Sequence, residues 1–292
     1  MQLHQALNAA VEFLTVARVP SPRMNAELLI MFTLDCDRAY LFAHPERELT
    51  AEDLARCDEA LARRATGVPA QYITGHQEFW GLDFIVSPAV LIPRPETEHV
   101  VEAVLELARL AQPEGRSRTS PHGLRIVDVG TGSGAIALAL AKELPSAEIH
   151  ATDISPEALD IARANAARHE LTSRIEFHET DLLGGLPTAS FDIVVSNPPY
   201  VGESEEDSVQ LEVRKFEPRN AVFAGPTGVE VIERMIPQAR AALAPEGWLV
   251  FEISGTIVDR VRSLLLSWNE VEIRNDLQGI ARVAIARKVT SG

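Results

Sequence analysis

The spacing of hydrophobic residues changes near residue 76. Over residues 3–65, apolar residues recur at three- and four-residue steps, the spacing of helices that bury one face. Ser21 precedes a proline, and Thr50 stands three residues before an aspartate, and both patterns are typical of helix starts. We therefore expect several short helices that form a small bundle over residues 1–74.

Beyond the bundle, strand-like runs replace this pattern. Aromatic and β-branched residues around Gly81 predict a β-hairpin, which we assign to a linker over residues 75–95. Residues 96–292 then alternate between apolar runs and helical segments, which predicts right-handed strand–helix–strand units and a mostly parallel sheet with helices on both faces. The expected strands are 124–129, 148–152, 174–179, 191–196, 248–253, 271–275 and 283–286. The last two lack room for a helix between them and should pair antiparallel.

Composition narrows the class of protein. With 46% hydrophobic residues among 292, the chain can bury a sizeable core, which excludes global disorder. No stretch free of charged residues approaches the roughly 20 residues of a membrane span, and the N-terminus lacks the basic segment of a signal peptide, so we expect a cytoplasmic protein without membrane contact. The net charge of −15 disfavours a protein that binds duplex nucleic acid through its phosphates. The eight histidines lack metal-ligand spacing, so no metal is expected.

A glycine-rich loop follows the first strand of the predicted sheet and leads into a helix. The loop consists of Gly130, Thr131, Gly132, Ser133 and Gly134. Glycines in such a turn allow positive φ and let the backbone approach a ligand. Asp153 ends the following strand, at the distance typical of a carboxylate that accepts hydrogen bonds from a ribose diol, while Ser155 is expected to cap the next helix. These features predict a site for an adenosine-like cofactor.

Two cofactors fit this loop. Gly130, Gly132 and Ala135 match the G-x-G-x-x-A pattern of a dinucleotide site. Asp128, just before the loop, would instead suit the ammonium group of S-adenosyl-methionine and repel a pyrophosphate, which favours S-adenosyl-methionine. Asp181, at the end of the third strand, is expected on the adenine side of the site.

The fourth strand delivers a tetrapeptide at its carboxyl end, where open α/β sheets bind ligands. The tetrapeptide is Asn197, Pro198, Pro199 and Tyr200. The Asn197 side-chain oxygen and the Pro198 carbonyl can accept both hydrogens of a planar NH₂ group, which aims the nitrogen lone pair at a methyl donor. Tyr200 can pack against the planar group. We therefore expect methylation of an amide or exocyclic nitrogen.

The pairing of VDVGTGSGAIALALA with VSNPPY resembles the amino-methyltransferases. The segments QEFWGLDFIVSPAVLIPRPETE and VRKFEPRNAVFAGPTG, together with the N-terminal bundle, resemble the release factor glutamine methyltransferase family, called PrmC or HemK. The resemblance implies a Rossmann-like class I methyltransferase fold in which the last strand is antiparallel, with a helical substrate-recognition domain. It also implies N5-methylation of the glutamine in the Gly-Gly-Gln motif of peptide chain release factors, which yields S-adenosyl-L-homocysteine as product. We expect a monomer.

The resemblance also implies roles for particular residues. The glycine loop, Asp153, Asp181, Leu182 and Asn197 would bind the cofactor, with Leu182 replacing an aromatic residue that the family often has there. The tetrapeptide from Asn197 to Tyr200 would hold the substrate glutamine, with Asn197, Pro198 and Tyr200 acting in catalysis. The remaining candidates, whose roles the sequence leaves open, are Arg94, Thr97, Glu98 and Glu252.

Two alternatives remain open on the residues alone. A DNA or RNA adenine-N6 methyltransferase would use the same tetrapeptide on a flipped base, but the N-terminal bundle has more acidic than basic residues and no stable nucleic-acid binding is expected. An NAD-dependent dehydrogenase, or a non-catalytic dinucleotide-binding protein, would have no use for that tetrapeptide.

Overall fold

The computed structural model describes residues 1–111 and 123–289, and its internal contacts divide the chain into two compact units. The first unit comprises Met1–His76 and Gln210–Phe216, and the second comprises Gln77–Val209 and Glu217–Gly292. The chain therefore passes between the units three times. None of the described helices is both long and apolar enough to cross a membrane.

The first unit is a helical bundle with an aliphatic core. Its helices are α1 (Leu3–Val16), α2 (Pro22–Leu34), α3 (Arg38–Ala43), α4 (Ala51–Ala65), α5 (Ala70–Thr74) and α9 (Leu211–Phe216). Thr50 caps α4 as predicted, because its hydroxyl accepts from the Asp53 N–H and the Asp53 carboxylate accepts from the Thr50 N–H. The predicted helix start at Ser21 is confirmed, since Ser21 is the N-cap residue of α2 and Pro22 its first helical residue, but Ser21 has a φ of +48° and its side chain makes no capping hydrogen bond within the described residues.

A buried ion pair joins α9 to this bundle. The Arg64 side chain on α4 is 4% exposed and lies 2.6 Å from the Glu212 carboxylate. Its Nε also donates to the Asn25 side chain at 2.7 Å. A buried guanidinium is stable only with such partners, so this pair ties the segment around Glu212 to helices nearly 150 residues earlier in the chain.

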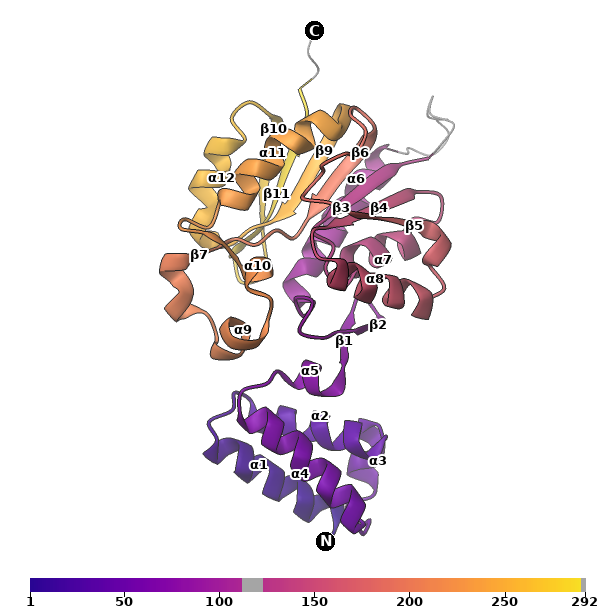
Figure 1. Ribbon diagram of the computed structural model, residues 1–292, viewed down its shortest axis with the longest axis vertical. Helices are drawn as coiled ribbons and strands as arrows, with labels where there is room; N and C mark the ends of the chain where they lie inside the picture. The colour runs from indigo at the N-terminus through magenta and orange to yellow at the C-terminus, as the bar shows by residue number, and fades with distance from the viewer. Residues whose placement is uncertain (112–122, 290–292) are drawn as a thin grey trace. The chain divides into compact units, whose positions relative to one another are not determined.

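The second unit is built on a seven-stranded sheet in the order β10-β11-β9-β6-β3-β4-β5 (Figure 1). The strands are β3 (Arg125–Val129), β4 (Glu148–Asp153), β5 (Ile175–Glu179), β6 (Phe191–Ser196), β9 (Leu243–Glu252), β10 (Asn269–Asn275) and β11 (Ala281–Arg287). The first five of these pair in parallel, β11 is antiparallel to β9, and β10 is antiparallel to β11. The predicted α/β fold, with its antiparallel last strand, is confirmed.

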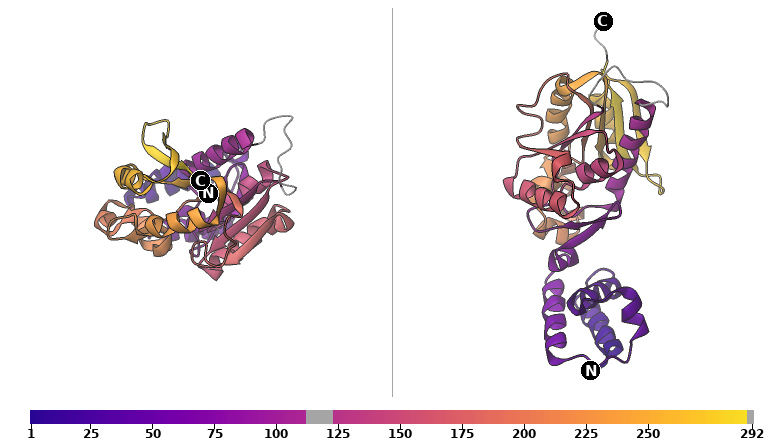
Figure 2. Two further views of the ribbon diagram at one scale, coloured as in Figure 1. Left: turned by 90° about the horizontal axis from the view of Figure 1, so that it is seen from above. Right: turned by 90° about the vertical axis from the view of Figure 1, so that its right-hand side faces the viewer.

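Helices cover both faces of this sheet. On one face lie α6 (Glu98–Ala111), α7 (Ala135–Glu143) and α8 (Pro156–Arg168), and on the other lie α11 (Glu230–Ala242) and α12 (Val258–Leu264) (Figures 1 and 2). The central strands are buried on both sides, as parallel strands under two helix layers should be. Short elements that the sequence did not predict follow β6: they are β7 (Val201–Gly202), α10 (Arg219–Val222) and β8 (Phe223–Gly225).

The predicted hairpin consists of β1 (His76–Phe79) and β2 (Leu82–Ile85). Asn165 on α8 fastens it to the sheet domain. This fully buried amide accepts from the Ile85 N–H at 2.7 Å and donates to the carbonyls of Ile85 at 3.0 Å and Ser133 at 2.9 Å. One side chain therefore satisfies backbone groups of the hairpin and of the glycine loop together.

We expect Asn165→Ala to lower the free energy of unfolding by about 3 kcal/mol, because three buried backbone groups lose their partner. Urea unfolding followed by circular dichroism measures this change. Asn8→Ala on the exposed face of α1 is the matched control and should change stability by less than about 0.5 kcal/mol. Equal effects of the two substitutions would show that the Asn165 contacts do not support the fold.

Candidate cofactor and substrate site

The carboxyl ends of β3, β4 and β6 border a cavity of about 520 Å³ within the second unit. Ten of the residues predicted for the site line it: Gly130, Thr131, Gly132, Ser133, Asp153, Asp181, Leu182, Asn197, Pro198 and Pro199. Gly134 and Tyr200 are outside this lining. The glycine loop and the tetrapeptide, about 60 residues apart in sequence, are thus brought to one cavity because their strands are neighbours in the sheet.

The three glycines of the loop have different physical reasons to be glycine. Gly130, Gly132 and Gly134 have φ values of +70°, +55° and +84°, a region that favours glycine. A Cβ on Gly134 would come within 2.7 Å of the Leu138 side chain on α7 and within 3.3 Å of the Ala162 Cβ on α8, so this glycine also allows α7 to pack against α8. At Gly130 and Gly132 no described atom lies within 4 Å of such a Cβ, which leaves the backbone open toward a ligand.

Asp153 joins the loop to the next strand. Its carboxylate accepts from the Gly132 N–H and the Ser155 N–H, both at 2.9 Å, and it borders the cavity. Burial raises the pKa of Asp153, and the backbone N–H groups act against this rise. Ser155 caps α8 as predicted, since its hydroxyl accepts from the Ala158 N–H.

The ammonium-binding role expected for Asp128 is wrong. Its side chain is buried at 1% exposure and is not part of the cavity lining. One carboxylate oxygen accepts from the Thr131 hydroxyl at 2.6 Å and the Ala137 N–H at 3.2 Å, so it holds the loop on the start of α7. Burial raises the pKa of Asp128 to about 7. The sequence placed this residue correctly beside the loop but could not give the direction of its side chain.

Asp181 and Leu182 lie at the cavity edge. Arg234 on α11, which the sequence did not indicate, forms an ion pair with Asp181 and also lines the cavity. Leu182 contributes apolar surface there, with a φ of +54°.

A buried hydrogen-bond chain fixes the amide of Asn197. The Asn197 Nδ2 donates to the Thr97 hydroxyl at 3.0 Å, and that hydroxyl donates to the Glu252 carboxylate at 2.6 Å. Because the Thr97 proton goes to Glu252, the hydroxyl must accept from Asn197, which defines which end of the amide faces Thr97. The Asn197 Oδ1 is consequently left for a ligand. Thr97 and Glu252 thus have a positioning role that the sequence could not assign.

Tyr200 belongs to the same chain of hydrogen bonds. Its hydroxyl donates to the other oxygen of Glu252 at 2.8 Å. Burial and the nearby carboxylate raise the pKa of Tyr200, which keeps its hydroxyl protonated. Burial also raises the pKa of Glu252, while hydrogen bonds from Thr97 and Tyr200 act in the opposite direction.

Glu217, another residue that sequence reasoning missed, connects two loops of the site. Its buried carboxylate accepts from the Ile92 N–H at 3.1 Å and pairs with Arg94. Both loops line the cavity, through residues 88–91 and 93 and through residues 218, 220, 221 and 223. Arg94 therefore supports the cavity wall from behind. Glu98 accepts from the Trp80 N–H of the hairpin and is also outside the lining.

The fold and the cavity define a class I S-adenosyl-methionine-dependent methyltransferase. The volume lies within the range of small-molecule sites, and the residues present fit this cofactor: an open glycine backbone, a carboxylate on the second strand and apolar walls. The methyltransferase small domain model matches residues 116–215, and the PrmC N-terminal domain model matches residues 5–75.

Comparison with known proteins gives the family. The release factor glutamine methyltransferase of Koribacter versatilis is 55% identical over 294 residues, covering 100% of both chains. That of Moorella thermoacetica is 44% identical over 90% of this chain and 89% of its own. The chain belongs to the release factor glutamine methyltransferase family. The hMettl16 catalytic domain, solved with a MAT2A 3′UTR hairpin, has the same fold, with a TM-score of 0.56 at 18% identity, over 80% of this chain and 83% of that one.

Thr97→Val removes the hydroxyl that orients Asn197, and we expect kcat for methyl transfer to fall by about 10- to 100-fold, roughly 1.4–2.8 kcal/mol. The dissociation constant of S-adenosyl-methionine should change less than about threefold. Thr97→Ser keeps the hydroxyl and should restore most of kcat. An equal loss in both variants would indicate that Thr97 serves only packing.

Asp128 gives a pH-dependent stability. Because its folded pKa of about 7 exceeds the unfolded value of 3.8, the folded state holds the extra proton and stability falls as pH rises from about 4 to 7. Asp128→Asn removes this loss. We therefore expect the free energy of unfolding of the variant minus that of the wild type to be about 2 kcal/mol larger at pH 8 than at pH 5. Urea unfolding at both pH values measures it. A difference independent of pH would contradict the raised pKa.

Proposed function

We propose that this protein transfers a methyl group from S-adenosyl-methionine to the side-chain amide nitrogen N5 of the glutamine in the Gly-Gly-Gln motif of peptide chain release factors. The observation that carries the proposal is the orientation of Asn197, whose Nδ2 is engaged by Thr97 so that its Oδ1 is available to a substrate N–H. The Koribacter versatilis relative, which matches over the full length of both chains, is named a release factor glutamine methyltransferase.

The cofactor residues follow from the cavity. The glycine loop would lie along the methionine portion, with Asp153 accepting from the ribose hydroxyls and Asp181 and Leu182 bordering the adenine. When bound, S-adenosyl-methionine supplies an electrophilic methyl group on its sulfonium. Asn197 would stand at the junction of cofactor and substrate, since it lines the same cavity as the loop.

The chain's own residues would position the substrate amide. The Asn197 Oδ1 and the Pro198 carbonyl accept its two N–H groups, and the prolines present no competing backbone N–H. The nitrogen would then face the methyl group that the bound cofactor supplies, the cofactor would leave as S-adenosyl-homocysteine, and one nitrogen proton would go to solvent. Orientation in the site supplies most of the rate, because the attacking nitrogen is neutral.

Tyr200 contributes from outside the cavity lining. Its hydroxyl is held by Glu252, so its ring forms a fixed wall behind the tetrapeptide and the hydroxyl does not donate a proton to the reaction.

The first unit, with its own aliphatic core, would serve as the domain that recognises the release factor. The reaction would take place in the cytoplasm, where release factors act, with the enzyme as a monomer and without stable nucleic-acid binding.

Mass spectrometry of a release factor incubated with the protein and S-adenosyl-methionine tests the proposal. We expect a gain of about 14 Da on the Gly-Gly-Gln peptide. Asn197→Ala should reduce the rate by more than about 100-fold while cofactor affinity stays within about tenfold, as expected of an interaction made mainly in the transition state. Asn269→Ala, at an exposed position of the second unit outside the cavity lining, is the control and should methylate at the wild-type rate.

Methylated adenine in DNA or RNA beside an unmodified release factor would overturn the proposed substrate. Parallel losses of rate and cofactor affinity in Asn197→Ala would instead leave the substrate intact and reduce Asn197 to a cofactor contact.

A further inference from the structure

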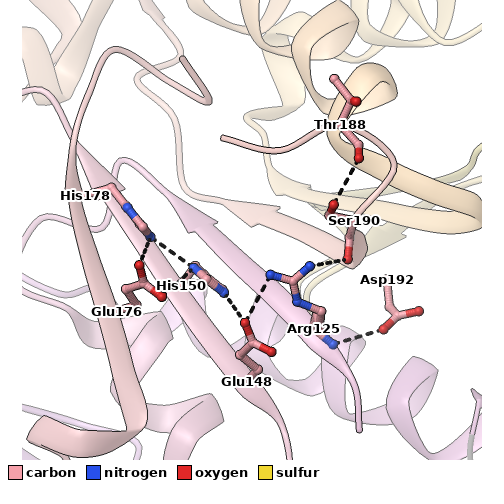
Figure 3. Close-up of polar contacts among 8 residues, drawn as sticks. All are labelled: Arg125, Glu148, His150, Glu176, His178, Thr188, Ser190 and Asp192. Atoms are coloured by element: carbon pink, nitrogen blue, oxygen red, sulfur yellow. Dashed lines mark hydrogen bonds and ion pairs between the residues drawn. The ribbon is translucent and has the colours of Figure 1, made fainter. Parts of the chain in front are cut away.

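Two histidines and a glutamate meet on the sheet, away from the cavity described above. His150 lies on β4, and Glu176 and His178 lie on the edge strand β5, where His150 is in register with Glu176 (Figure 3). None of the three residues lines the cofactor cavity. Their side chains share the face that carries Phe191, because the His150 ring contacts the Phe191 ring edge-on at 5.1 Å.

The ligand atoms of this cluster are close enough for one ion. The His150 Nδ1 and the His178 Nε2 are 3.0 Å apart, and the two oxygens of Glu176 lie 3.7 Å from one ring nitrogen each. Nitrogens bound at 2.0–2.1 Å to a tetrahedral zinc ion are separated by about 3.3 Å. The spacing of the three groups is therefore near that of a coordination sphere.

A second layer of contacts orients the central histidine. The His150 Nε2 lies 2.8 Å from a Glu148 oxygen, and the same oxygen lies 3.0 Å from the Arg125 guanidinium (Figure 3). A carboxylate beside Arg125 only accepts, so Nε2 carries the proton and the Nδ1 lone pair faces His178 and Glu176. Metal-binding histidines commonly have such a carboxylate on the other ring nitrogen, where it fixes the tautomer.

We propose that His150, His178 and Glu176 form a binding site for a divalent transition-metal ion such as Zn²⁺, with water completing the coordination. Two histidines and one glutamate are a ligand set that zinc accepts. The ion would fasten the edge strand β5 to β4 and so stabilise the sheet on which the cofactor loop rests. The sequence spacing hid this site, because its ligands come from two adjacent strands separated by a helix.

Binding requires only small changes in the cluster. Without metal, the His178 Nε2–H donates to the His150 Nδ1, and on binding this proton moves to the His178 Nδ1 through exchange with solvent, so both facing nitrogens present lone pairs and no net proton is released. The His150 side chain is 5% exposed and stays fixed, whereas Glu176, at 65%, can turn inward. His178 must tilt so that both lone pairs converge on the ion, and at 24% exposed it has some room to do so.

Calorimetric titration of the metal-stripped, tag-free full-length protein with ZnCl₂ tests the site. We expect the wild-type protein to bind one equivalent of Zn²⁺ saturably and His178→Gln to bind it at least tenfold more weakly. In a parallel titration with Co²⁺, we expect the absorption band of a tetrahedral Co²⁺ site in the wild-type protein and its loss in His178→Gln. His99→Gln is the matched control. The His99 Nδ1 lies 3.0 Å from a carboxylate oxygen of the exposed Glu102, but among the described residues these two belong to no group of three potential metal ligands. This variant should bind zinc as wild type does.

Circular dichroism shows whether His178→Gln is folded. If it is not, Glu176→Gln, a substitution at an exposed position, is titrated instead. Absence of saturable zinc binding to the wild-type protein would overturn the proposal. Undiminished affinity in the folded variant would overturn it as well, since zinc would then be bound elsewhere, for example at Cys36.

Discussion

The carboxylate of Glu252 is the constraint on which the site depends. It is buried at the end of β9, and its two oxygens accept hydrogen bonds from the hydroxyls of Thr97 and Tyr200. A buried carboxylate without donors would be costly, so these partners are required for stability. The same requirement directs the Thr97 proton away from Asn197 and thereby fixes the amide that faces the cavity. Stability of the core and orientation of the Asn197 amide thus have one physical cause.

The cofactor loop shows a similar dependence on buried polar groups. Side chains from other elements hold the loop: Asp128 accepts from the Thr131 hydroxyl, Asp153 accepts from the Gly132 N–H, and Asn165 donates to the Ser133 carbonyl. Asp128 accepts its hydrogen bonds inside the protein, and burial raises its pKa to about 7. The loop is therefore prepared for its ligand before binding, which reduces the ordering needed on association.

The sheet and the two motifs could be predicted because they rest on local patterns: continuous apolar runs mark parallel strands, and glycines mark a turn at positive φ. Asp128 was misread because adjacency to a loop does not tell which face of a strand a side chain takes. Arg234, Glu217 and the Thr97–Glu252 pair escaped prediction because their partners lie 53 or more residues away. Charge pairs and hydrogen bonds across such distances carry no periodic signal.

The fold by itself does not choose the substrate. A catalytic domain with the same fold at 18% identity was solved with an RNA hairpin, so the fold also occurs in a protein that binds RNA. The group that we propose the tetrapeptide to recognise is a planar NH₂, and glutamine and adenine both offer one. The choice must therefore lie in what brings that group to the cavity. In this chain the first unit, an acidic helical bundle, has little to attract a phosphate backbone, and an electrically neutral side-chain amide on a protein meets no such barrier.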